Sequence, residues 1–548
     1  MTDLLQTDVL VIGEGSAGQT AALAASEESC DVIILGDGRP PSTAVSTGFL
    51  TYAAHDGFTR EQVFEAMSQD TGRGLCDSVL LTRLLDEAPK IIADVISAYG
   101  IPVDKAERGL RVRRETGKSG RDLLSGLDAE YARPGGVEDV AGLMMEFSST
   151  HGTALYARLR KAVKASPNIR RLKGSALVME PGATVVTALI DGRVVTIAAR
   201  AVVLATGGLQ GLYELTDNPN TLIGDGHGMA LDAGAALVDI EFMQFYPLSV
   251  HEKGVPTLFL YPDFPRLASL VNDKGENLLV KHLGEGVKHF GGLHNWDELA
   301  LVVQAEIVDG RQVFVDFRET KPTDWAPDSL TGTFLSKCVP TFMQALVRVA
   351  PSSHYTVGGL KVDADGRTNL PNVYAAGEVA GGVHGANRHG GVALVEAITF
   401  GRIAGQHAAR NLVGGAAGSG RPSLPPPSSK AGNPARCADL MGELRRTNQF
   451  ALGPIRDGAR LQSAGERFAE LTEEALSYGW NDYAEMHEVL RVQRAILMSE
   501  CMRQAMLRRT ESRGVHCRSD FPNSSDAWLK KQVVTLRNGD FHFKDIPI

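Results

Sequence analysis

The feature that most constrains the fold is a glycine turn close to residue 1. The run TDVLVI at residues 7–12 predicts a β-strand, GEGSAG follows at 13–18, and an alanine-rich helix and a second strand are expected at 19–26 and 31–35. Glycines at this spacing permit a tight turn, a close approach of the backbone to a pyrophosphate, and packing of the helix on the strand. The stretch therefore predicts a dinucleotide-binding site.

Two later strands end in similar turns. AVVLATGG at 201–208 is an apolar strand that runs into paired glycines, and NVYAA at 372–376 is followed by Gly377 and Glu378. Ligands of α/β sheets bind at the carboxyl ends of strands, so the three turns can face one ligand. The combination is typical of flavoproteins with two dinucleotide folds, and it favours FAD over NAD.

Beyond Glu378 the chain presents a polar cluster on flexible backbone. Glycine pairs at 381–382 and 390–391 bracket it, and glycine lets the backbone come close to a ligand because it has no side chain. A helix is expected at 392–405, with the N–H groups of its amino end pointing at a carbonyl or anion. The bracketed polar residues are His384, Asn387, Arg388 and His389.

Composition narrows the class of protein. A chain of 548 residues exceeds what one hydrophobic core supports, and it should divide into two to four domains. The net charge of -9 argues against nucleic acid as the main partner. The six cysteines form no CxxC pair, so we expect reduced thiols and neither a bound metal nor an iron–sulfur cluster.

No targeting or membrane segment is predicted. The first residues lack a basic segment followed by an apolar stretch and a cleavage site. No apolar run reaches the roughly 18 residues that a membrane span needs. We expect a cytoplasmic protein.

These motifs and others make the chain similar to a known family, the succinate dehydrogenase / fumarate reductase flavoproteins, which include L-aspartate oxidase. The resemblance implies an α/β fold: a Rossmann-like FAD-binding domain with an inserted α+β capping domain and a helical carboxyl-terminal domain. The matching motifs are GEGSAG at 13–18, STAVSTG at 42–48, THGTAL at 150–155, ATGG at 205–208, GDGHGMALDAGA at 224–235, QFYP at 244–247, HYTVGG at 354–359, AAGE at 375–378, HGANRHGG at 384–391 and ESRGVHCRSDFP at 511–522.

The resemblance also divides the chain. The capping domain is expected between the two halves of the FAD-binding domain, where it closes over the cofactor. A Gly/Ser/Pro-rich linker precedes the last domain, in which apolar residues recur at helical spacing over 459–478 and 484–509. The expected parts are residues 1–239 with 350–413 (FAD-binding domain), 240–349 (capping domain), 414–435 (linker) and 436–548 (helical domain).

Cofactor contacts follow from the same resemblance. Relatives with covalently attached FAD have a histidine after the serine of an SHT motif, whereas here Ser42 is followed by Thr43. We therefore expect FAD to be bound without a covalent bond. At the end of the second strand, where an acid for the adenosine ribose is usual, Gly36 stands and Asp37 follows. The residues expected at FAD are Gly13, Gly15, Ser16, Ala17, Gly18, Asp37, Ser42, Thr43, Ser46, Thr47, Gly48, Thr206, Gly207, Asp225, Glu378, Ala393 and Leu394.

By this resemblance, two of the five elements of the family's substrate site are retained. In the family a small dicarboxylate lies between the histidine of an HP motif, a Thr-Glu pair, an arginine of the capping domain, the histidine of HYT and the arginine of ANR. His354 matches the HYT histidine and Arg388 matches the ANR arginine. The resemblance therefore implies that one carboxylate is gripped by a bidentate guanidinium and an imidazole.

The other three elements are changed. Tyr246 stands at the HP histidine, Leu260 and Tyr261 stand at the Thr-Glu pair, and Trp296 stands at the capping-domain arginine. A second carboxylate in such an aromatic, apolar pocket would lose several kcal/mol of solvation. Succinate, fumarate and aspartate are therefore poor candidates, and we expect one carboxylate or similar anion on an uncharged body.

Trp296 also replaces the arginine to which proton transfer is assigned in relatives. Burial can shift a tyrosine or histidine into a useful range, but the sequence does not choose among the replacements. The candidates are Tyr246, Tyr355, His389, Arg266 and His384, of which Tyr355 and His389 are also expected in the substrate pocket.

The function predicted first is a soluble FAD-dependent oxidoreductase that moves hydride between flavin N5 and the carbon next to a carboxylate, forming or reducing a C=C bond. Arg388, His354 and Tyr246 would be its catalytic residues. The alternatives are amine oxidation as in L-aspartate oxidase, with oxygen as acceptor, and a flavoprotein subunit that passes electrons to a partner. Chemistry like that of adenylylsulfate reductase is less favoured, because no residue points to a nucleotide substrate.

Overall fold

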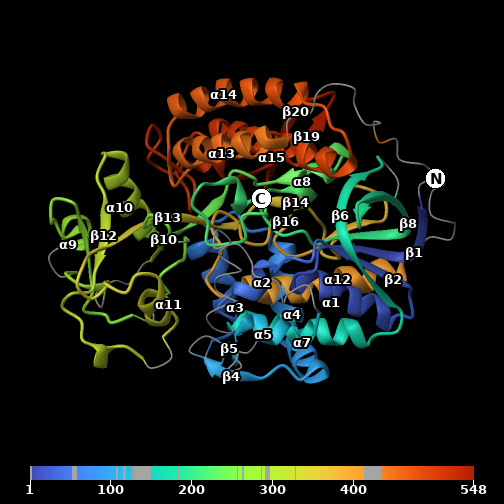
Figure 1. Cartoon of the computed structure of the whole chain (residues 1–548), viewed down its shortest axis with the longest axis horizontal. Helices are drawn as coiled ribbons and strands as arrows, with labels where there is room; N and C mark the ends of the chain where they lie inside the picture. The colour runs from blue at the N-terminus through green and yellow to red at the C-terminus, as the bar shows by residue number, and fades with distance from the viewer. Residues whose placement is uncertain are drawn as a thin grey trace.

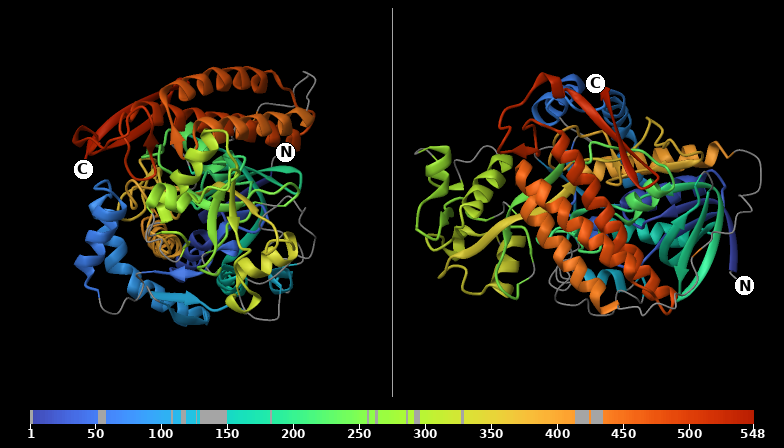
Figure 2. Two further views of the ribbon diagram at one scale, coloured as in Figure 1. Left: turned by 90° about the vertical axis from the view of Figure 1, so that its left-hand side faces the viewer. Right: turned by 90° about the horizontal axis from the view of Figure 1, so that it is seen from above.

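The computed structural model describes most of the chain, in three parts that pack against one another (Figures 1 and 2). The first contains a largely parallel sheet, the second is a smaller α+β unit at the left of Figure 1, and the third is a layer of long helices across the top. This arrangement confirms the predicted fold class. The described residues are 3–51, 58–106, 109–114, 119–125, 127–128, 150–181, 184–255, 257–261, 264–284, 287–290, 296–326, 329–412, 424 and 434–548.

Four parallel strands position the site. In spatial order they are β2 (Val32–Gly36), β1 (Asp3–Ile12), β8 (Arg193–Leu204) and β15 (Val373–Ala375). Ile12 pairs with Leu35 on one side and Leu204 on the other, and Leu204 pairs with Ala375. The carboxyl ends of all four strands therefore meet at one edge, where a doubly wound sheet binds its ligand. β6 (Ile169–Met179) and β7 (Val185–Ile190) complete the sheet.

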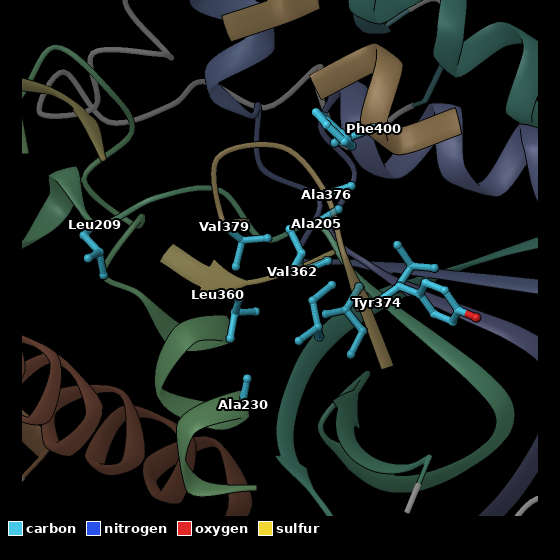
Figure 3. Close-up of a cluster of buried hydrophobic side chains, with 14 of the residues drawn as sticks. Ala205, Leu209, Ala230, Leu360, Val362, Tyr374, Ala376, Val379 and Phe400 are labelled. Atoms are coloured by element: carbon cyan, nitrogen blue, oxygen red, sulfur yellow. The ribbon is translucent and has the colours of Figure 1, made fainter. Parts of the chain in front are cut away.

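Helices α1 (Ser16–Glu27) and α12 (Ala393–Arg410) cover this sheet in close contact with each other. A Cβ at Gly405 would lie 2.2 Å from the carbonyl oxygen of Ala21, so only glycine allows the two helices this approach. Figure 3 shows the core near β15 and α12, where Tyr374 and Phe400 are buried. Burial of such surface contributes about 25 cal/mol per Å² to folding.

The remaining elements of this part frame the sheet. They are α2 (Ser42–Val45), β3 (Phe49–Leu50), α3 (Arg60–Glu65), α4 (Ser78–Tyr99), β4 (Val103–Ala106), β5 (Gly109–Val112), α5 (Gly120–Ser125), α7 (His151–Ala165), α8 (Asp225–Asp232), β9 (Leu237–Val238), β14 (Gly359–Lys361) and β16 (Ala380–Gly381). The hairpin strands β4 and β5 form a separate small sheet with β3, which pairs with β5.

The second part has its own sheet and its own core. The strands lie in the order β10 (Met243–Val250), β13 (Val347–Thr356), β12 (Val313–Asp316) and β11 (Ser269–Asn272). Helices α9 (Leu278–Leu283), α10 (Trp296–Val308) and α11 (Leu330–Cys338) pack around the sheet. β13 continues beyond residue 349 into the first part, so β10 and β13 carry residues of this unit to the edge of the parallel sheet.

The third part consists of three helices and a hairpin. The helices are α13 (Pro434–Ala451), α14 (Gly458–Ser477) and α15 (Tyr483–Arg508), and short strands β17 (Ile455–Arg456) and β18 (Cys517–Arg518) pair beside them. Strands β19 (Lys530–Arg537) and β20 (Asp540–Pro547) join β9, β14 and β16 in one sheet. The sequence analysis missed this hairpin, although Asn538 and Gly539 between alternating residues are a hairpin signal. The predicted linker at 414–435 lies almost wholly outside the described residues.

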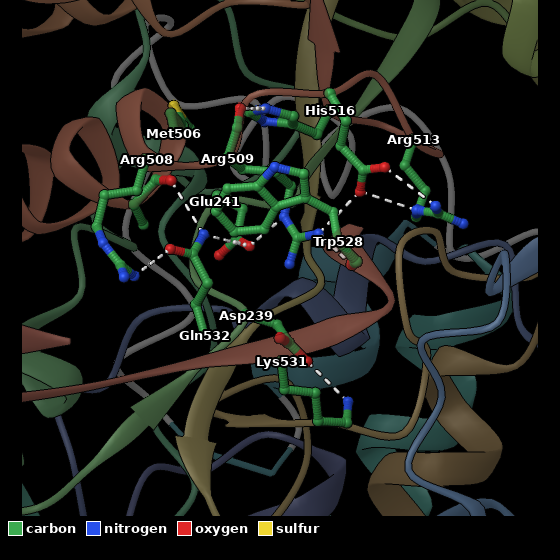
Figure 4. Close-up of polar contacts among 12 residues, drawn as sticks. Asp239, Glu241, Met506, Arg508, Arg509, Arg513, His516, Trp528, Lys531 and Gln532 are labelled. Atoms are coloured by element: carbon green, nitrogen blue, oxygen red, sulfur yellow. Dashed lines mark hydrogen bonds and ion pairs between the residues drawn. The ribbon is translucent and has the colours of Figure 1, made fainter. Parts of the chain in front are cut away.

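A buried polar network attaches the third part to the first (Figure 4). Arg509 forms a 2.7 Å ion pair with Glu241, and both side chains are fully buried. Lys531 pairs with Asp239 at 2.8 Å. Gln532 donates a hydrogen bond to Glu241. Buried charges are tolerated when they are paired, and removing one partner of such a pair is strongly destabilising.

Candidate active site

One cavity of about 890 Å³ lies at the carboxyl edge of the parallel strands. Its volume is in the range of cofactor and ligand sites. Residues of all three parts line it: the turns after β1, β8 and β15, strand β10 of the second part, and helix α15 of the third. The sequence analysis expected the first two parts here and missed the contribution of α15.

The turn after β1 explains its glycines. Gly13 has a φ of +111°, and a Cβ on it would lie 2.1 Å from the carbonyl oxygen of Ala205. A Cβ on Gly18 would lie 2.0 Å from the carbonyl oxygen of Gly13. Both glycines are therefore required by packing. Gly15 differs, because a Cβ there would meet only ordinary contacts, and it lines the cavity. Its missing side chain leaves space for a ligand.

Thr43 lies beside this turn. Its Oγ1 accepts a hydrogen bond of 3.0 Å from the backbone N–H of Ser16 and donates one of 3.1 Å to Ser16 Oγ. Thr43 is buried and lines the cavity together with Ser42. The threonine that stands where covalently flavinylated relatives have histidine thus holds the start of α1.

Packing at the end of β2 bears on why Gly36 stands where an acid is usual and Asp37 follows it. A Cβ on Gly36 would lie 2.3 Å from Oε2 of Glu14, which is buried and forms an ion pair with Arg171. A side chain at this position would displace the Glu14 carboxylate from that ion pair. Asp37 lines the cavity, and its side chain is half exposed.

Several buried polar atoms at the cavity have no hydrogen-bond partner among the described residues. They are Oγ of Ser42, Oγ1 of Thr206 and Oδ1 of Asp225. Buried polar groups in proteins are nearly always paired, so these atoms fit a bound molecule rich in hydroxyl and phosphate groups. With the glycine turn and the volume, they fit the FAD that the sequence predicts. All the residues predicted at FAD line the cavity except Gly18, which packs beneath the turn.

Glu378 lines the cavity at the end of β15. Burial raises the pKa of its carboxyl to about 8, although the backbone N–H of Thr356, the side chain of Gln210 and the charge of Arg388 oppose the shift. The carboxyl is therefore largely protonated at neutral pH and can donate a hydrogen bond.

Helix α15 reaches the cavity through His487 and Arg491. Arg491 pairs with Asp225 at 3.1 Å and donates a hydrogen bond to the carbonyl oxygen of Thr221. Burial lowers the pKa of His487. No motif signals these two residues, because they lie on a helix whose sequence reads as core packing.

Arg388 is held from three directions. Its Nε donates to Oε1 of Gln244 at 3.1 Å, and its Nη1 donates to the carbonyl oxygen of His389 at 3.1 Å. The guanidinium lies 4.7 Å from the centre of the Tyr355 ring, a cation–π distance. Arg388 is 7 % exposed and lines the cavity, so its charge is presented there in a fixed orientation.

His354 projects from β13 into the same cavity. Its Nδ1 lies 2.8 Å from Oδ2 of Asp217, whose side chain is fully buried. Asn218 donates hydrogen bonds to Oδ1 of Asp217 and to the carbonyl oxygen of His354. The sequence analysis did not identify Asp217, which lies 137 residues away along the chain.

Aromatic side chains line the same end of the cavity. Tyr246 lies 5.5 Å from the His354 ring and 5.1 Å from the Phe259 ring. Phe49 and Tyr261 also line the cavity, and their rings face each other at 6.4 Å. Phe49 and Phe259 were not predicted, since neither belongs to a motif.

One residue predicted in the substrate pocket, Leu260, is not at the cavity surface. Leu260 is fully buried in the core of the second part, because its backbone N–H pairs with Leu248 and turns the side chain into that core. Its neighbour Tyr261 lines the cavity. Trp296 begins α10, and its side chain lies outside the described residues.

The acid/base candidates occupy different environments. Tyr246, Tyr355 and His389 line the cavity, whereas Arg266 is exposed elsewhere and His384 is buried near Glu396. The hydroxyl of Tyr355 donates to Glu396 at 2.9 Å, and burial raises its pKa well above the usual value. The hydroxyl of Tyr246 donates to the carbonyl oxygen of Leu260 at 2.8 Å.

The described residues were also compared with the requirements of metal sites, disulfides and membrane-spanning helices. The described residues contain no cluster of three or more His, Cys, Asp or Glu side chains that could hold a metal ion. The six cysteines are free. None of the helices within the described ranges combines the length and apolar character that a bilayer crossing requires.

Comparison with known proteins agrees with the cofactor prediction. Residues 8–394 match a family described as FAD binding domain, and residues 441–547 match one described as fumarate reductase flavoprotein C-term. The chain is 32% identical to an L-aspartate oxidase of Caulobacter vibrioides over 96% of both chains. It is 28% identical to a component of the CoM/CoB fumarate reductase of Methanothermobacter marburgensis over 99% of both.

Solved structures show the same fold. The FrdA chain of Escherichia coli quinol fumarate reductase superposes with a TM-score of 0.80 at 22% identity, covering 100% of this chain and 97% of that one. Sdh1 of Mycobacterium smegmatis superposes with a TM-score of 0.77 at 25% identity, covering 100% and 94%. The chain belongs to the FAD-dependent oxidoreductase family that includes the fumarate reductase and L-aspartate oxidase flavoproteins.

Proposed function

We propose that this FAD-dependent enzyme forms or reduces a C=C bond beside the carboxylate of a small organic acid that carries one carboxylate and an uncharged body. The observation that carries the proposal is the pairing of one fixed guanidinium, Arg388, with an aromatic wall in the same cavity. A guanidinium binds a carboxylate through two parallel hydrogen bonds. The aromatic side chains of this wall carry no charge that could pair with a second carboxylate.

The aromatic wall suits a substrate whose remaining part is apolar or contains a ring. Phe49, Tyr246, Phe259 and Tyr261 contribute it from two parts of the molecule. Burying apolar ligand surface against them contributes about 25 cal/mol per Å². This gain offsets the ion pair that a dicarboxylate would have made.

FAD, when bound, supplies the hydride acceptor or donor at N5 of its isoalloxazine ring. The turn at Gly13–Gly18, Thr43, Thr206, Asp225 and Glu378 would hold it. The second part would exclude water from the reacting atoms, since Phe259 and Tyr261 line the same cavity as Arg388.

Amine oxidation is the second candidate, and the 32% identity to an L-aspartate oxidase favours it. That reaction would consume a 2-amino acid and oxygen and release hydrogen peroxide. An electron-transfer partner in place of oxygen is the third possibility, since the relatives include one component of a fumarate reductase.

An anaerobic screen tests the proposal. Carboxylates with one or two carboxyl groups, each with and without a 2-amino group, are mixed with the FAD-loaded protein, and flavin bleaching is followed. Oxygen is then admitted and peroxide is measured. We expect bleaching by monocarboxylates without an amino group. Bleaching by 2-amino acids alone, followed by stoichiometric peroxide, would favour amine oxidation instead.

A further inference from the structure

The contact between His354 and Asp217 differs from the other polar contacts at the cavity. It joins a 27 % exposed imidazole to a side chain that has no exposure at all. The two atoms in contact are Nδ1 of the ring and Oδ2 of the carboxylate, at 2.8 Å. A fully buried carboxylate beside an imidazole holds the ring in one orientation and favours a proton on the contacting nitrogen.

The surrounding contacts make this arrangement rigid. Asn218 donates to Oδ1 of Asp217 at 2.8 Å and to the carbonyl oxygen of His354 at 2.9 Å. Thr216 donates to the carbonyl oxygen of Ser353 at 3.1 Å, so the loop and the strand are joined at two successive residues. Gln210 adds a hydrogen bond to the carbonyl oxygen of His354. Backbone and side chain of His354 are thus both fixed by the loop that carries Asp217.

With the proton on Nδ1, the other ring nitrogen of His354 is left as a proton acceptor. Nε2 lies on the side of the ring away from Asp217, and His354 lines the cavity that Arg388 also lines. A neutral imidazole with a bare Nε2 repels a carboxylate but accepts a proton, and the buried carboxylate then stabilises the imidazolium.

We propose that His354 is the acid/base of this enzyme, that Asp217 is its positioning residue, and that Arg388 alone grips the substrate carboxylate. This assignment rests on the proposed function. It names the residue that takes over the proton transfer assigned in relatives to the capping-domain arginine. In the oxidative direction bound FAD would supply the acceptor for the hydrogen of one carbon, which would leave as hydride with both electrons of its C–H bond. The C–H bond of the neighbouring carbon breaks, its proton goes to Nε2 of His354, and its electron pair becomes the second bond of the C=C.

The tyrosines at the cavity are less suited to this role. Tyr355 already donates its hydroxyl hydrogen to Glu396, and Tyr246 donates its own to the carbonyl oxygen of Leu260. Either would have to break a hydrogen bond before it could exchange a proton with the substrate. His354 needs no such change, because the hydrogen bond to Asp217 uses the opposite ring nitrogen.

The test measures the imidazole tautomer in the FAD-loaded protein labelled with ¹⁵N-histidine. His354 is assigned by the signal lost in His354→Gln. In the neutral ring we expect the proton on Nδ1 and Nε2 bare, and we expect Asp217→Asn to move the proton to Nε2, because the amide N–H can donate to Nδ1. The matched control is Asp365→Asn, which removes a carboxylate 3.2 Å from His407 outside the cavity and should leave the His354 signals unchanged.

A second measurement addresses catalysis, with 3-phenylpropanoate as the probe of flavin bleaching. General acid/base groups contribute about 10²- to 10⁴-fold, so Asp217→Asn should slow bleaching by that factor while Asp365→Asn should not. Wild-type His354 with its proton on Nε2, or normal bleaching by Asp217→Asn, would overturn the assignment. Absence of bleaching in the wild type would instead count against the proposed function, and the tautomer would still decide whether Asp217 positions the imidazole.

Discussion

Gln244 and Arg388 hold each other through reciprocal hydrogen bonds. Nε of Arg388 donates to Oε1 of Gln244 at 3.1 Å, and Nε2 of Gln244 donates to the carbonyl oxygen of Arg388 at 2.9 Å. The same amide also donates to Asn387. Gln244 comes from β10 and Arg388 from the loop after β16, so this contact fixes the guanidinium relative to the second part of the molecule.

Replacing Arg388 should therefore weaken carboxylate binding without unfolding the protein. Arg388→Lys keeps the charge but loses the planar fork, and hydrogen bonds to charged groups are worth about 1.5–3 kcal/mol, or about 10- to 100-fold in affinity. The measurement is the Kd of 3-phenylpropanoate from the perturbation of the flavin absorbance. Arg266→Lys is the control, since Arg266 is exposed outside the cavity. Equal affinities in both variants would contradict the role given to Arg388.

Glu378 should make the free energy of unfolding depend on pH. Its pKa is about 8 in the folded protein and about 4.5 ordinarily, so the folded state binds the extra proton between these values. The stabilisation is complete below pH 4.5 and is lost as the pH rises to about 8, at no more than about 1.4 kcal/mol per pH unit. We expect the free energy of unfolding of Glu378→Gln, measured in denaturant titrations, to rise relative to that of the wild type between pH 5 and 8. Parallel curves for the two proteins would contradict the raised pKa.

Much of the cofactor end could be predicted from the sequence because it depends on local backbone. Gly13 and Gly18 are each required by one close contact with a backbone carbonyl oxygen, and such contacts recur wherever this turn occurs. The substrate end depends on residues far apart in the chain. Asp217 meets His354, and Phe49 meets Tyr261, only through the packing of separate parts.

The position of Leu260 illustrates a further limit of prediction from the sequence. Successive residues of an extended segment point to opposite sides, so a local match places the pair Leu260–Tyr261 without deciding which of the two faces the ligand. The hydrogen bond from the Leu260 N–H to Leu248 decides it in favour of Tyr261. That bond joins the segment to a strand the motif does not include.

FAD should be bound without a covalent bond. Thr43 offers a hydroxyl that is already hydrogen-bonded to Ser16, and no ring nitrogen stands there to attack the flavin. Precipitation with acid should release all of the yellow colour into the supernatant, as measured by absorbance. Flavin that remains on the denatured protein would refute this expectation.

The second part should close over bound ligand, and Arg111 should favour the closed arrangement. Its guanidinium lies 4.6 Å from the centre of the Phe49 ring and 5.5 Å from that of Tyr261, so it connects the small sheet to the second part. A cation–π contact of about 0.5–1 kcal/mol corresponds to about 2- to 5-fold in equilibrium. We expect limited proteolysis within 240–349 to be faster by that factor in Arg111→Leu.

Protection by ligand supplies the control for closure. In the wild type, 3-phenylpropanoate should slow the same cleavage, because closure over the ligand buries the segment. Cleavage at equal rates with and without ligand would count against closure. Arg113→Leu is the matched control, since Arg113 follows the same strand but pairs with Asp104 on the surface.

The central claim is that the cavity serves one carboxylate, and flavin bleaching under anaerobic conditions tests it most directly. The FAD-loaded wild-type protein is mixed in turn with 3-phenylpropanoate, succinate and L-aspartate at equal concentration, and the first-order rate of bleaching is recorded. The account predicts that 3-phenylpropanoate bleaches the flavin at least about 10-fold faster, because an unpaired second carboxylate against Tyr246 and Phe259 costs more than about 1.4 kcal/mol. Faster bleaching by succinate or L-aspartate would contradict it.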